Sequence, residues 1–153
     1  MYKKYFSIAM GLIFSANALQ AQTTNVNDAD IAAVKSVIQN MFTAMKNSDI
    51  VLLKTCFSPT TIFQTVVSKQ GETFVKDEKV QDFFNSIGKQ PAGALDERIV
   101  FETVRANNDM AIAWTPYEFY YKDKYSHNGV NSFQLVKLKE GWKIQYIIDT
   151  RYR

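Results

Sequence analysis

The sequence predicts an α+β domain in which helices pack on one face of a curved antiparallel sheet. Apolar residues recur at helical spacing mainly in the first half of the chain, whereas apolar and polar residues alternate through much of residues 97–148. Short turn sequences separate the alternating segments, as they do between consecutive antiparallel strands. With 46% hydrophobic residues, a single domain of this length can bury a core.

The first 21 residues have the three regions of a cleavable signal peptide. Lys3 and Lys4 precede the uncharged residues 6–19, and small residues end at Ala21. The apolar run is shorter than the about 20 residues that cross a bilayer, although a membrane anchor and a buried first helix are alternatives. We therefore expect an exported protein, periplasmic or secreted, without a membrane span in its mature form. Residues 22–27 are expected to be a flexible leader, and residues 28–153 a single domain.

Charge and composition exclude several classes of function. Cleavage after Ala21 lowers the formal net charge from +3 to +1, and nucleic-acid binding requires clustered positive charge, so we expect no nucleic-acid partner. His127 and Cys56 are the only histidine and cysteine, whereas zinc sites draw on several such residues. Phosphate loops, dinucleotide fingerprints and nucleophile elbows are absent from the sequence. We expect no metal and no cofactor, and a buried, inert Cys56 rather than an intermolecular disulfide.

Three amphipathic helices are predicted. The first begins near Asp28, the second runs from Asp49 until Pro59 ends it, and the third covers residues 80–87 and stops at Gly88. The apolar residues of the long first helix recur three or four positions apart: Ile31, Val34, Ile38, Met41 and Met45.

Six strands are predicted. The first two, residues 60–68 and 72–75, form a hairpin around Gly71. Four long strands follow, over residues 97–106, 110–122, 125–138 and 142–148. Pro116 predicts a bulge or an unpaired edge position in the second long strand. Strict alternation along the last strand puts Asp149 and Arg151 on one face. It puts a second set on the other face: Trp142, Ile144, Tyr146 and Ile148.

This order of elements, with AMKNSD at residues 44–49, resembles the nuclear transport factor 2-like superfamily. Segments 114–119 (WTPYEF), 127–135 (HNGVNSFQL), 142–144 (WKI) and 149–151 (DTR) are similar to a small bacterial exported branch labelled lumazine-binding. The resemblance covers residues 28–153 and implies a cone-shaped fold, in which three N-terminal helices close over a strongly curved sheet. Superfamily members isomerise or dehydrate ring compounds, cyclise polyketides, bind ligands or dimerise, so the fold alone does not select a function.

The candidate catalytic residues are His127, Tyr117 and Asp149. His127 has the only side chain whose ordinary pKa lies near neutrality, although a hydrogen bond to a neighbour is the simpler interpretation. Tyr117 and Glu118 can donate and accept protons in an apolar cavity. Asp149 and Arg151, two apart on a strand, predict either a structural ion pair or an arginine that grips an anionic ligand.

Three functions remain open from the sequence. The first is a binding module whose aromatic cone pocket holds a small ring-containing ligand. The second is a cofactor-independent isomerase, dehydratase or cyclase that uses the candidate catalytic residues. The third is an interaction module that forms a homodimer through the exposed face of its sheet. The predicted ligand-binding residues are Phe63, Phe83, Phe84, Trp114, Tyr117, Glu118, Asn131, Phe133 and Arg151.

Overall fold

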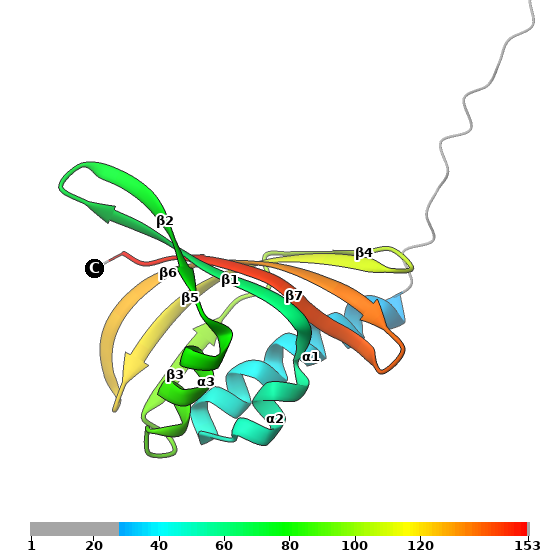
Figure 1. The fold of residues 1–153 in the computed structure, drawn as a ribbon, viewed down its shortest axis with the longest axis horizontal. Helices are drawn as coiled ribbons and strands as arrows, with labels where there is room; N and C mark the ends of the chain where they lie inside the picture. Colours follow the sequence, from blue (N-terminus) through cyan, green and yellow to red (C-terminus); the bar gives the residue numbers. More distant parts are fainter. Residues whose placement is uncertain (1–27, 153) are drawn as a thin grey trace, which may run out of the picture.

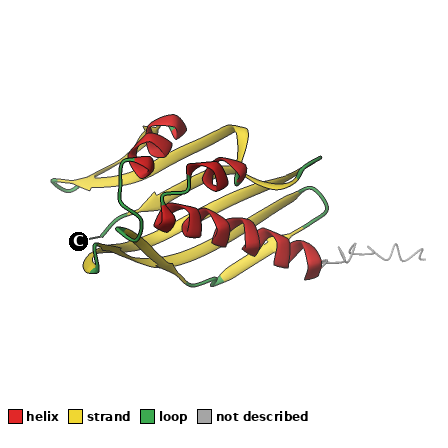
Figure 2. Ribbon diagram, turned by 90° about the horizontal axis from the view of Figure 1, so that it is seen from below, coloured by secondary structure: helices red, strands yellow, loops and turns green. Residues whose placement is uncertain are grey.

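The computed structural model describes residues 28–152, in which three helices lie on one face of a seven-stranded, strongly bent sheet (Figures 1 and 2). The predicted α+β class with a curved sheet is confirmed. The elements are α1 (Asp28–Asn47), α2 (Ile50–Thr55), β1 (Phe57–Lys69), β2 (Glu72–Glu78), α3 (Val80–Gly88), β3 (Leu95–Ile99), β4 (Thr103–Ala106), β5 (Met110–Tyr121), β6 (Lys124–Leu138) and β7 (Gly141–Thr150). The predicted signal peptide and leader lie outside the described residues. Within residues 28–152, no helix is both long enough and apolar enough to cross a membrane.

The strands are ordered β2-β1-β7-β6-β5-β3 across the sheet, and β4 also pairs with β5. The predicted antiparallel pairing of β5 with β6 and of β6 with β7 is confirmed. The sheet is not wholly antiparallel, however, because β1 pairs with β7 in parallel. This pairing places the first strand beside the last and joins the two halves of the chain.

The bulge that was predicted at Pro116 lies not in β5 itself but in the segment that pairs with β5 there. Pro116 itself pairs with Val130 of β6, and its carbonyl oxygen accepts a hydrogen bond from Val100 N at 2.9 Å. On that side, Ile99 pairs with Tyr117 and Thr103 with Trp114, so the β3–β4 segment contains one extra residue. Proline has no N–H to donate to this ladder. The single strand predicted over residues 97–106 is therefore divided into β3 and β4.

A bulge in β7 changes which side chains face the helices. Tyr146 pairs with Gln134 and Ile144 with Leu135, so Gln145 is the extra residue. Trp142 and Ile144 are buried before the bulge, and Ile147 and Asp149 are buried after it. The prediction that Trp142, Ile144, Tyr146 and Ile148 share one face is therefore wrong beyond Ile144. Because one extra residue reverses the alternation, both Trp142 and Asp149 reach the interior.

A polar contact holds α1 against the last two strands. The buried carboxylate of Asp30 accepts hydrogen bonds from Lys137 Nζ at 2.6 Å and from Trp142 Nε1 at 2.9 Å. The hydrogen bond from Lys137, followed by that from Trp142, lowers the pKa of Asp30. Around this contact, α1 packs its apolar face on the sheet, and Cys56 is buried in the same core. Burial raises the pKa of the Cys56 thiol, which favours the unreactive protonated form.

Candidate functional site

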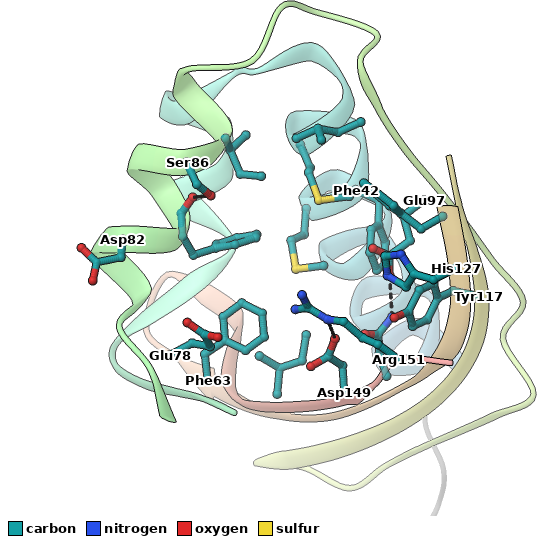
Figure 3. A pocket seen from close by; sticks show the side chains of 18 residues that line it. Phe42, Phe63, Glu78, Asp82, Ser86, Glu97, Tyr117, His127, Asp149 and Arg151 are labelled. Carbon is teal, nitrogen blue, oxygen red and sulfur yellow. Dashed lines mark hydrogen bonds and ion pairs between the residues drawn. The ribbon is translucent and has the colours of Figure 1, made fainter. Parts of the chain in front are cut away.

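A cavity of about 460 Å³ lies between the helices and the concave face of the sheet. Helices α1 and α3 supply much of its apolar wall, and β3, β5, β6 and β7 supply most of its polar groups. In Figure 3, Glu97, His127 and Tyr117 lie together on the sheet side, across the cavity from Asp82 and Ser86 of α3. Pockets of this size hold small organic molecules.

The apolar wall is built mainly from aromatic and methionine side chains. Phe83 of α3 meets Phe63 of β1 edge to face, with ring centroids 5.1 Å apart. Met41 and Met45, one turn apart on α1, face the same space. Aromatic rings bury a large area in a defined orientation, whereas methionine adapts to irregular shapes. This wall suits the flat body of a ring compound.

The first polar group joins Asp149 to Arg151, close to the end of β7. Arg151 Nε donates to Asp149 Oδ2 at 2.8 Å, and its Nη2 is 3.4 Å from Thr65 Oγ1. Asp149 is only 5% exposed, yet its Oδ1 has no hydrogen-bond partner among the described residues. A buried carboxylate oxygen without a donor is costly in free energy, so this atom marks a place where a donor is missing.

The second polar group joins Glu97 of β3 to Asn131 of β6. Asn131 Nδ2 donates to Glu97 Oε1 at 2.8 Å. Burial raises the pKa of Glu97 to about 7; the hydrogen bond from Asn131 opposes this rise, and the negative charge of Asp149 adds to it. Glu97 thus changes its protonation state near neutral pH inside the cavity.

The third polar group contains Tyr117 and His127. The Tyr117 hydroxyl donates to the Thr150 carbonyl at 2.9 Å. Burial raises the pKa of Tyr117 well above its ordinary value, and the charges of Glu97 and Asp149 add to the rise. The His127 ring lies 5.0 Å from that of Phe119, and its Nδ1 is 3.1 Å from Ser126 Oγ. A tyrosine of high pKa stays protonated and acts as a donor.

The structure brings most of the predicted site residues together. The three candidate catalytic residues line the cavity, as do Phe63, Phe83, Asn131 and Arg151. On β6, Phe133 and Leu135 share the inward face with His127 and Asn131, because side chains alternate along the strand. Whether any of these residues binds a ligand or takes part in catalysis stays a prediction.

Four of the predicted ligand-binding residues lie outside the cavity. Trp114, which is 47% exposed, and Glu118 point outward from β5, because they alternate with the inward Tyr117. Phe133 is fully buried behind Phe42, whose ring it meets edge to face. Phe84 packs edge to face on Phe57 and lines a second hollow of about 390 Å³. The prediction that these four residues line the cone pocket is wrong.

Sequence reasoning missed Glu97. The signal was present in the segment Leu95-Asp96-Glu97-Arg98-Ile99, where strand alternation puts Glu97 between two inward apolar side chains. A carboxylate on the apolar face of a strand is rare unless it is paired or functional. In the part of the chain that the structure describes, no cluster of histidine, cysteine and carboxylate residues could hold a metal ion.

Fold and cavity together define the class: a cone-shaped α+β domain whose bent sheet and helices enclose an apolar cavity with buried carboxyl groups. More particularly, the chain has the nuclear transport factor 2-like fold. It is similar to an NTF2-like protein of unknown function from Shewanella baltica OS155, with TM-score 0.65 and 13% identity over 82% of this chain and 96% of that one. No family model matches the sequence, and no curated protein matches it significantly.

Two further solved structures share the fold. A protein of unknown function with a cystatin-like fold from Nostoc punctiforme PCC 73102 has TM-score 0.66 and 10% identity, over 83% of this chain and 94% of that one. A protein provisionally named a dehydratase of the NTF2-like family, from Streptomyces avermitilis, has TM-score 0.61 and 14% identity, over 82% of this chain and 98% of that one. These likenesses show the fold. The narrower resemblance to the branch labelled lumazine-binding stays a prediction.

Proposed function

We propose that this protein binds a small ring-containing molecule in the cavity between its helices and its sheet. The observation that carries the proposal is Asp149, a buried carboxylate in the cavity lining whose Oδ1 has no donor among residues 28–152. An apolar wall with a few polar groups is the usual composition of a small-molecule site. The wall contributed by Phe63 and Phe83 suits a flat ring.

Truncating the aromatic wall is expected to weaken binding. Phe83→Ala removes a ring worth about 1.5–3 kcal/mol of apolar contact, so affinity falls about tenfold or more. Native mass spectrometry of gently purified protein detects the retained molecule, and its occupancy is compared between variants. Gln81→Ala, an exposed change on the same helix, is the matched control. Equal occupancy in Phe83→Ala and the wild type would contradict this use of the cavity.

We propose that the protein is exported, and this proposal rests only on residues 1–21, which have the three regions of a cleavable signal peptide. The intact mass of the protein recovered from the exported fraction tests it: a mass that lacks these residues supports export, and a full-length cytoplasmic product contradicts it.

A second candidate function is cofactor-independent proton transfer, as in an isomerase or dehydratase. The specific observation that favours it is Glu97, a cavity carboxyl with a pKa of about 7. Such a group both accepts and releases a proton near neutral pH. Tyr117, His127 and Asp149 line the same cavity. Conversion of the bound molecule, followed by NMR and lost in Glu97→Gln, would distinguish an enzyme from a binding protein.

We also propose a homodimer that forms through the outer face of the sheet. The twelve outward positions across the centre of β1, β7, β6 and β5 contain no charged residue. They form the central outer patch: Ile62, Gln64, Val66, Ile112, Trp114, Pro116, Val130, Ser132, Gln134, Tyr146, Ile148 and Thr150. A large uncharged, partly apolar patch is typical of a protein interface.

A charge in the central outer patch is expected to prevent dimerisation. Trp114→Lys buries an unpaired ammonium group in the interface, which should shift the mass in solution from dimer to monomer. Light scattering after size-exclusion chromatography measures the mass. Val51→Lys, on an 80% exposed position of α2, is the control and should stay dimeric. A wild type that is already monomeric at high concentration would overturn the proposal.

A further inference from the structure

We propose that the ligand is an uncharged ring compound with an amide edge, whose N–H donates to Asp149 and whose adjacent carbonyl oxygen accepts from Arg151. This inference rests on the proposed function and names the chemistry of the same cavity. It differs from the expectation that Arg151 grips an anion.

The group that accepts the hydrogen bond from the ligand N–H is the Asp149 carboxylate. Its Oδ2 is occupied by Arg151 Nε at 2.8 Å, whereas its Oδ1 has no donor within residues 28–152. An ionised carboxylate only accepts hydrogen bonds, so the missing partner must carry an N–H or O–H group. Satisfying a buried acceptor recovers the free energy that its desolvation costs.

The group that donates a hydrogen bond to the ligand carbonyl oxygen is the Arg151 guanidinium. Of its five N–H groups, Nε is used by Asp149, and a second, on Nη2, contacts Thr65 Oγ1 at the long distance of 3.4 Å. The Arg151 side chain is 49% exposed, whereas that of Asp149 is 7% exposed. Figure 3 shows the guanidinium extending from Asp149 into the cavity. A ligand therefore meets the arginine donors first, and because Asp149 Oδ1 is itself buried, the ligand N–H reaches it only once the side chains beside it shift.

The charges of the cavity favour a neutral ligand over an anion. Arg151 and Asp149 cancel each other, and the other carboxyl groups in the lining belong to Glu78, Asp82 and Glu97. The raised pKa of Glu97 reflects burial that already disfavours negative charge here. An anion would be repelled by these carboxyl groups and would lose its hydration in the buried cavity. A cation would meet the guanidinium, so a group with a donor and an acceptor side by side fits the pair best.

The test compares bicyclic probes of one shape and different edges. The probes are 2-quinolinone, its N-methyl derivative, naphthalene and 2-naphthoate, titrated into the purified wild-type protein by calorimetry. We expect 2-quinolinone to bind at least tenfold more tightly than the N-methyl compound, which lacks the donor, and than 2-naphthoate. Asp149→Asn should remove the preference for 2-quinolinone over its N-methyl derivative, whereas Arg151→Met should weaken the binding of both lactams, which share the carbonyl group, and keep that preference. Glu118→Gln, on the outer face of β5, should keep it.

The outcomes separate the two proposals. Equal affinity for 2-quinolinone and its N-methyl derivative would overturn the amide edge and leave small-molecule binding in place. Tightest binding of 2-naphthoate would overturn it in favour of anion recognition by Arg151. No binding of any probe at millimolar concentration would overturn both the amide edge and the proposed function of the cavity. The comparison of N–H with N-methyl needs no variant, so it stands even if Asp149→Asn fails to fold.

Discussion

Gly129→Ala is expected to destabilise the protein severely. A Cβ atom at residue 129 would lie 1.9 Å from the Thr150 carbonyl oxygen and 2.9 Å from Cε1 of Tyr117. The first of these atoms belongs to the backbone of β7, so no side-chain rotation relieves the clash. Instead, the end of β7 must move away from β6.

The movement of β7 would break identified contacts. Asn128 and Tyr152 exchange two backbone hydrogen bonds, of 3.1 and 2.8 Å, next to the clash. Overpacking costs about 1–3 kcal/mol and occasionally more, and we expect the upper end because backbone must shift. This corresponds to a fall in Tm of roughly 10 °C or more.

Thermal unfolding followed by circular dichroism measures this effect. Gly88→Ala is the matched control, since its added Cβ meets only the flexible Ile50 side chain at 3.2 Å. Its Tm should change by only a few degrees. A Gly129→Ala protein that melts within two degrees of the wild type would show that the β6–β7 contact is looser than the structure indicates.

Stability is expected to fall as the pH rises from about 5 to 8, because of Glu97. Its pKa is about 7 in the folded protein against an ordinary 4.5. Between these values the folded chain holds a proton that the unfolded chain has lost. The folded state is therefore favoured below pH 4.5 and loses this advantage as the pH rises through 7. The shift corresponds to roughly 2–3 kcal/mol, since Glu97 keeps some contact with solvent.

Glu97→Gln is expected to remove this pH dependence. Glutamine keeps an oxygen that can accept the Asn131 hydrogen bond and carries no charge. Urea unfolding at pH 5 and pH 8 should show similar stability for the two proteins at pH 5, and a more stable variant at pH 8. Comparing the two proteins cancels Asp30 and Asp96, whose lowered pKa values act in the opposite direction at acid pH. Glu118→Gln should behave as the wild type, and parallel curves for wild type and Glu97→Gln would contradict the prediction.

A stabilising Glu97→Gln change would also bear on function. Buried carboxyl groups that reduce stability at neutral pH are retained where they serve a site. The experiment therefore measures the free-energy cost of keeping Glu97 ionisable, independently of any ligand.

Local sequence determined most elements of this fold, but the second helix, which was predicted to run until Pro59, ends at Thr55, and residues 57–59 already belong to β1. Apolar spacing of three and four residues predicted α1 and α3, because a helix brings such positions to one face. Alternation predicted β5, β6 and most of β7, and on β6 it also predicted correctly that His127 and Asn131 share a face with Phe133. These features depend only on neighbours along the chain, and the sequence contains them in full.

The tertiary structure alone decided which side chains meet in the cavity. Gln145 bulges out of β7 where Ser58 Oγ donates to its Oε1 at 2.6 Å, a contact between strands 87 residues apart in sequence. Without that bulge, strict alternation would put Asp149 on the opposite face from Trp142. The bend of the sheet likewise brings Glu97 of β3 to Asn131 of β6. Strand phase and sheet curvature arise from contacts between distant segments, so alternation along one strand carries no record of them.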